Sequence, residues 1–95
     1  MKYVYLWYMK MTQEALHKNI ADSKVSENWL AKAREAVKKH GMKLVVLGSP
    51  FATAEQFVVG VETDVPLDEF NKLGSDLYKI DPAFVDYAKT YIITQ

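Results

Sequence analysis

The first segment of the chain is apolar on both of its faces, and this constrains the fold more than any other feature. Residues 2–11 are rich in aromatic and β-branched side chains and contain no glycine or proline, so they are predicted to form a strand. Because side chains alternate along a strand, the two apolar sets are Tyr3, Tyr5, Trp7 and Met9 on one face, and Val4, Leu6 and Tyr8 on the other. Both sets need cover, so we expect a central strand with helices on one side of the sheet and another partner on the opposite side. The pattern leaves open which set meets the helices.

The rest of the chain alternates between helical and strand patterns. Apolar residues at helical spacing predict a short helix at 13–21, a longer one at 27–40 and a third from 64 to 80, with Thr12 and Ser26 as N-caps of the first two. Apolar and β-branched runs predict further strands at 42–48, 56–63 and 88–94, and 84–87 is left as a connector. Gly41 is expected to end the second helix and Pro82 the third. The order is β-α-β-β-α-β, in a single domain over residues 1–95.

This order predicts an α+β, ferredoxin-like fold, in which a four-stranded antiparallel sheet has its helices on one face. The other sheet face then carries one of the apolar sets of the first strand, which is more apolar surface than monomers usually expose. A chain of 95 residues also buries only roughly two thirds of the surface that it exposes when unfolded. We therefore expect a homodimer that forms through the sheet face.

The composition argues against several classes of function. Twelve basic and 12 acidic side chains cancel, and Arg34 is the single arginine, so a nucleic-acid partner is not expected. The absence of cysteine excludes disulfides, thiolate zinc sites and thiol nucleophiles, and favours a cytoplasmic location. No apolar run approaches the ~18 residues of a membrane span, and the N-terminal run is too short for a signal peptide.

Several local features together resemble one superfamily. They are the tyrosine-rich first strand, the Gly48-Ser49-Pro50 ending of the second, the Val61-Glu62-Thr63-Asp64 run before the last helix, and the Asp81-Pro82 break before an aromatic last strand. This pattern resembles the dimeric α+β barrel superfamily, in particular its small YciI-like, EthD-like and antibiotic-biosynthesis-monooxygenase-like members. The resemblance implies two sheets packed face to face with the helices outside. It also implies small-molecule sites between sheet and helices.

The catalytic residues of these relatives match the chain poorly. A haem-degrading relative would have an asparagine on the first strand, and residues 3–9 contain none. YciI-like proteins use a histidine and an aspartate near the first helix and second strand, and His17 and Asp22 lie in roughly that region. The superfamily includes cofactor-independent oxygenases, isomerases, haem-degrading enzymes and ligand-sensing domains, so the resemblance leaves the activity open.

A site is predicted between the sheet and residues 12–25, because the break at 22–24 makes this the least regular part of the helical layer. His17 is the candidate catalytic residue, since histidine exchanges protons near neutral pH. The candidate substrate-binding residues are apolar or aromatic: Tyr5, Trp7, Leu16, Ile20 and Trp29. The alternatives are that His17 is a surface or core-edge histidine and that the aromatic rings only pack the core and interface.

The remaining titratable groups suggest little chemistry. His40, in the last turn of its helix, is expected to interact with the negative end of the helix dipole. Glu62 shares a strand face with Val58 and Gly60, and its pKa would rise if a dimer buried it. Glu14 and His17 form one Glu-x-x-His pair, but no second pair exists to complete a di-metal site, so neither a metal nor a cofactor is expected.

Two functions from different classes fit these observations. The first is a small homodimer that binds a small apolar or aromatic metabolite, with or without transforming it, and uses no cofactor. The second is a non-catalytic assembly or ligand-sensing domain, in which the aromatic sheet face serves contact between copies. Whether the protein is an enzyme is left open by the sequence.

Overall fold

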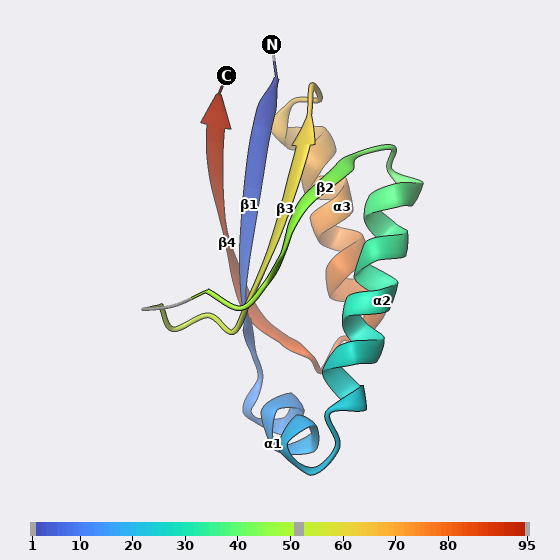
Figure 1. Cartoon of the computed structure of the whole chain (residues 1–95), viewed down its shortest axis with the longest axis vertical. Helices are drawn as coiled ribbons and strands as arrows, with labels where there is room; N and C mark the ends of the chain where they lie inside the picture. Colours follow the sequence, from blue (N-terminus) through green and yellow to red (C-terminus); the bar gives the residue numbers. More distant parts are fainter. Residues whose placement is uncertain (1, 51–52, 95) are drawn as a thin grey trace.

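Four antiparallel strands form one sheet, and two long helices pack on one of its faces (Figure 1). The computed structural model describes residues 2–50 and 53–94. In chain order, the elements are β1 (Tyr3–Met11), α1 (Gln13–Ala21), α2 (Lys24–Lys39), β2 (Lys43–Gly48), β3 (Phe57–Thr63), α3 (Leu67–Ile80) and β4 (Val85–Thr94). The strand order β2-β3-β1-β4 places β1 in the interior of the sheet. The predicted α+β, ferredoxin-like arrangement is confirmed, with two helices in its first connection.

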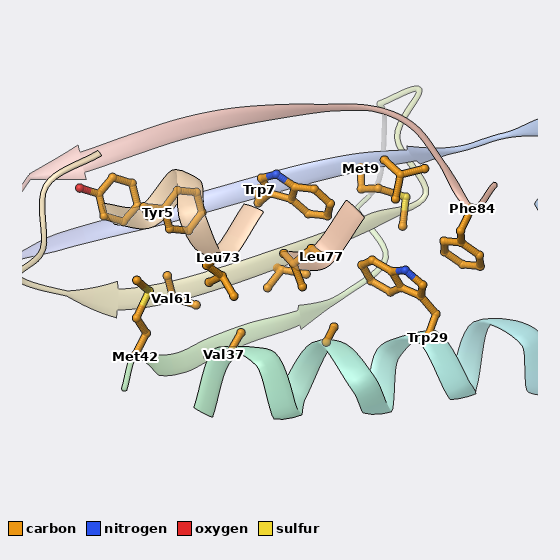
Figure 2. Close-up of a cluster of buried hydrophobic side chains, with 14 of the residues drawn as sticks. Tyr5, Trp7, Met9, Trp29, Val37, Met42, Val61, Leu73, Leu77 and Phe84 are labelled. Carbon is orange, nitrogen blue, oxygen red and sulfur yellow. The ribbon is translucent and has the colours of Figure 1, made fainter. Parts of the chain in front are cut away.

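The first strand meets the helices through Tyr5, Trp7 and Met9. These side chains are at most 3% exposed and lie against α2 and α3 (Figure 2). The alternate residues Val4, Leu6 and Tyr8 are half-buried on the opposite face. The structure thus settles which of the two apolar sets faces the helical layer.

The helical layer is held to the sheet by aromatic stacking and aliphatic packing. Tyr5 stacks on Phe70 of α3 with ring centroids 4.4 Å apart, and Trp29 of α2 stacks between Trp7 and Phe84 at 6.2 and 5.1 Å. The helix positions that complete this core are Ala33, Val37, Leu73 and Leu77. Trp29 follows the predicted apolar stripe of α2 and is 2% exposed.

Helix α1 lies beyond the end of the sheet instead of covering a face (Figure 1). Its predicted N-cap is confirmed, because Oγ1 of Thr12 accepts a hydrogen bond from the backbone N–H of Ala15 at 3.1 Å. The backbone N–H of Thr12 donates to the carbonyl of Phe84, and its hydroxyl donates to the carbonyl of Ala83. These bonds attach the start of α1 to the α3–β4 connection.

Three predicted element starts differ from the structure by three residues each. Helix α3 begins at Leu67 and not at residue 64, because Pro66 has extended backbone and occupies the N-cap position. Helix α2 begins at Lys24, with Ser23 and not Ser26 at its N-cap position, because Oδ1 of Asp22 accepts the backbone N–H of Lys24 and starts the turn earlier. Strand β4 begins at Val85, three residues before the expected start, since Val85 already pairs with Met11 of β1. The start of β4 is decided by long-range pairing, which no local pattern reveals. The predicted helix end at Gly41 is confirmed by its φ of 70°.

No helix in the described part of the chain is both long and apolar enough to cross a membrane.

Candidate functional site

The sheet face opposite α2 and α3 is apolar and open. We call it the helix-free face, and its central side chains are Val4, Leu6, Tyr8, Val46, Val58, Tyr91 and Ile93. The register places them together, because Leu6 lies opposite Gly60 on one side and Tyr91 on the other. Tyr91 is 55% exposed and Ile93 is 47% exposed. The apolar face that was predicted to lack helix cover is therefore present in the monomer.

A hollow of about 640 Å³ lies at one end of this face. Its lining is mainly apolar, with polar groups from the β2–β3 connection and from β4: Leu6, Tyr8, Thr53, Ala54, Glu55, Lys89, Tyr91, Ile92 and Ile93. The rings of Tyr8 and Tyr91 meet edge to face, 5.4 Å apart. The end of the β2–β3 connection thus forms one wall above the strands.

The end of the β2–β3 connection is anchored to β1 by Gln56. Its backbone N–H donates to the carbonyl of Met9 at 3.1 Å, and its side-chain Oε1 accepts the N–H of Met11 at 2.8 Å. The preceding residue, Glu55, is thereby held above the strands, where it reaches β4. Backbone register places Tyr87 and Lys89 on the same face, opposite Lys10 and Tyr8 of β1.

Glu55 is the buried charged residue of this site. At 7% exposed, it is the one polar or charged side chain in the buried set of the described residues. The hydroxyl of Tyr87 donates to its Oε2 at 2.5 Å, and Nζ of Lys89 lies 3.9 Å from the same oxygen. Lys89 also stands 5.7 Å from the ring centroid of Tyr87. The three side chains form a compact group, the Glu55 cluster.

Contacts within the Glu55 cluster shift the pKa values of Glu55 and Tyr87 in opposite directions. The hydrogen bond from Tyr87 lowers the pKa of Glu55, against the opposing effect of burial and with help from the charge of Lys89. The same bond to the carboxylate raises the pKa of Tyr87. At neutral pH the cluster therefore presents a carboxylate and a phenol that donates to it, with Lys89 beside them.

A second hollow, of about 360 Å³, lies between α1, α2 and the α3–β4 connection; it touches the segment 12–25 of the predicted site but is lined by no strand residue of the described part of the chain. Its lining mixes apolar and charged residues: Lys18, Val25, Asn28, Trp29, Lys32, Ile80, Asp81 and Phe84. Trp29 is the one predicted site residue among them. Nε1 of Trp29 has no hydrogen-bond partner among the described residues and is fully buried, so it is not open to this hollow.

The structure does not bring the six predicted site residues around one cavity. His17 is exposed on α1, Leu16 is half-buried and Ile20 is 76% exposed. Tyr5 and Trp7 lie in the core. The hydroxyl of Tyr5 is already engaged, because it donates to the carbonyl of Val65 at 2.7 Å, and burial raises its pKa.

The other two titratable residues that the sequence singled out contact side chains of opposite type. His40 is the C-cap of α2, and its Nε2 lies 2.7 Å from Oδ2 of Asp76 on α3. Glu62 lies on the helix-free face with Val58 and Gly60, as its strand alternation predicted, and its Oε1 accepts from Nζ of Lys2 at 3.2 Å. No three histidine or acidic side chains of the described residues gather where they could hold a metal ion.

Sequence reasoning missed the Glu55 cluster for a topological reason. Glu55 lies in a connection without periodic pattern, and Tyr87 was assigned to a connector. The usable signal was the alternation of Tyr87, Lys89 and Tyr91, which places them on one face once β4 is extended to Val85.

Comparisons with known proteins find similarity to solved structures alone. No family model matches the chain, and no curated protein matches it. Among solved structures, the chain is similar to protein Atu4242 from Agrobacterium tumefaciens, at 18% sequence identity and a TM-score of 0.45. The match covers 99% of this chain and 92% of that one.

Proposed function

We propose that the protein is a homodimer that packs two helix-free faces together and binds a small apolar or aromatic metabolite in the hollow beside the Glu55 cluster. The resemblance to the dimeric α+β barrel superfamily implies the face-to-face dimer. It places ligands between sheet and helices, whereas the site proposed here lies on the helix-free face.

The observation that carries the proposal is the shape and lining of the hollow. Its volume of about 640 Å³ falls within the roughly 300–1,000 Å³ range of small-molecule sites. Leu6, Tyr91 and Ile93 offer an apolar wall, while the polar groups lie to one side at Glu55 and Lys89. An apolar lining with few polar groups suits an aromatic ligand better than a sugar or a phosphate.

The exposure of the same face supports a second copy as its cover. Tyr91, Ile93 and Val46 are each more than two fifths exposed, which costs free energy in water. A two-fold axis through the face would bury both patches at once, because the same surface then serves both subunits. The open side of the hollow would be closed by the partner.

The test is calorimetric titration with indole, 2-naphthol and benzyl alcohol. We expect at least one to bind the unmodified protein and to raise its melting temperature. Tyr91→Ala should weaken binding by about tenfold or more through loss of the wall, whereas Ile20→Ala, at an exposed apolar position on α1, should not. Absence of binding by all three, or equal binding by Tyr91→Ala, would overturn the ligand site. A dimer without ligand binding would favour the assembly function.

A further inference from the structure

The hollow on the helix-free face has a polar end, formed by the Glu55 cluster, that its apolar walls do not explain. We propose that this cluster selects aromatic carboxylic acids that carry a hydroxyl or ammonium group on the carbon next to the carboxylate. The inference rests on the proposed function, since it concerns the same hollow, and it names the class of ligand.

Glu55 supplies the acceptor for the ligand's hydrogen-bond donor. Tyr87 and Lys89 both approach Oε2, and neither engages Oε1. Glu55 lines the hollow. An ionised carboxylate only accepts hydrogen bonds, so a group that binds Oε1 must be an O–H or N–H donor.

Lys89 supplies the charge for the ligand's carboxylate. Its Nζ is 3.9 Å from Oε2, beyond hydrogen-bond distance, so the N–H groups of the ammonium are not used by Glu55. The side chain is 57% exposed and lines the hollow. An anionic group entering the hollow gains a charge-assisted bond there, and repulsion by Glu55 keeps it on the lysine side.

The short distance between the carboxylate of Glu55 and Nζ of Lys89 limits how far apart the ligand's hydrogen-bond donor and its carboxylate can be. Because the acceptor and the cation belong to neighbouring residues only a few ångströms apart, one ligand can meet both only if its donor and its carboxylate are close together. A substituent on the carbon next to the carboxylate satisfies this condition. The aromatic ring then lies toward Tyr8 and Tyr91.

Four probes that each carry a phenyl ring on a short chain separate these contributions. They are 3-phenyllactate and phenylalanine, which have both groups, 3-phenylpropanoate, which lacks the donor, and phenethylamine, which lacks the carboxylate. In calorimetric titration of the full chain, at least one of the first two should bind about tenfold or more tightly than the last two. Which of the two binds better distinguishes a hydroxy acid from an amino acid.

Variants assign the selectivity to named atoms. Glu55→Gln should reduce the affinity for the preferred probe to that for 3-phenylpropanoate, and Lys89→Gln should reduce it to that for phenethylamine. Tyr87→Phe removes one hydroxyl and replaces Glu55→Gln if that variant does not fold. It should reduce the affinity for the preferred probe more than the affinity for 3-phenylpropanoate. Glu62 lies on the same face outside the hollow, so Glu62→Gln should leave the affinity for each of the four probes unchanged.

The outcomes distinguish this inference from the function on which it rests. Equal affinities for all four probes, or selectivity that survives Glu55→Gln and Lys89→Gln, would overturn the selective role while leaving the apolar site in place. Binding of indole or 2-naphthol without binding of any of the four acids and amines would overturn it as well. Failure of both probe sets would overturn both proposals.

Discussion

Gly60 lies where the sheet has no room for a side chain. A Cβ at this position would lie 3.0 Å from Cδ2 of Leu6 and 3.1 Å from Cβ of Val46. Leu6 of β1 and Val46 of β2 pack over Gly60 from the two adjacent strands, so their side chains cover this part of β3 on the helix-free face. Leu6 can rotate away, but Cβ of Val46 moves only with its backbone.

We expect Gly60→Ala to destabilise the protein by about 1–3 kcal/mol, as overpacked sites do, despite the better strand propensity of alanine. Gly48→Ala is the matched control, because a Cβ there meets no atom within 4 Å, and its change should stay within about 0.5 kcal/mol. Urea denaturation at one protein concentration measures both. Equal stability losses for the two variants would show that Val46 and Leu6 do not restrict position 60.

Trp29 shows that packing outweighs a hydrogen bond at one core position. Its indole N–H is buried without a partner among the described residues, which typically costs about 1–3 kcal/mol. The same ring stacks on both Trp7 and Phe84 with interplanar angles of 8°. Burial of an aromatic side chain and two stacked contacts offset the lost bond.

At the scale of elements, a side-chain hydrogen bond between His40 and Asp76 joins the C-terminus of α2 to α3. The hydrogen bond from His40 lowers the pKa of Asp76, more than burial raises it. A depressed pKa in the folded protein means that this contribution to stability is present above the unfolded pKa of about 3.9, and that it is lost as the pH falls through the lower folded value.

Comparison of the unmodified protein with Asp76→Asn therefore gives a pH-dependent difference in the free energy of unfolding. The difference should be fully present above the unfolded pKa of about 3.9 and should be lost as the pH falls through the lower folded pKa of Asp76. Urea denaturation at several pH values measures it, and Asp86→Asn, at an exposed position of β4, serves as the control. A difference that is constant or grows toward low pH would contradict the role of the pair.

The strands show where local patterns lose predictive power. Strand β1 was predicted to within a residue, because its run of aromatic and β-branched side chains without glycine or proline favours a strand by itself. Strand β4 was predicted too short, because its first residues, Val85 to Tyr87, follow a proline break and become strand only by pairing with Met11 and Lys10. Pairing depends on a partner more than 70 residues away in the chain.

At the scale of the whole molecule, the helix-free face determines the expected oligomeric state. We expect light scattering at micromolar concentration to give a mass of about twice 10.9 kDa. Tyr91→Lys places a charge in the middle of the face and should give a monomer. Ile20→Lys replaces a more exposed apolar residue on α1 and should leave the dimer intact.

A wild-type monomer would contradict the sheet-face dimer, as would a Tyr91→Lys variant that keeps the dimer mass. Loss of the dimer in Ile20→Lys with retention in Tyr91→Lys would place the interface on the helical side instead.

The sequence alone determined the order of the elements and most of the core, because both follow from local patterns. The run of aromatic and β-branched residues defined β1, the 3.6-residue period defined the stripe that contains Trp29, and single residues such as Thr12 and Gly41 defined helix ends. Only the tertiary structure decided which face of β1 meets the helices and that Glu55 meets Tyr87, 32 residues further along the chain. The physical reason is that both faces of β1 are apolar, so burial energy does not distinguish them locally. The contact of Glu55 with β4 exists only after Gln56 has been anchored to β1 and β4 has paired with the same strand.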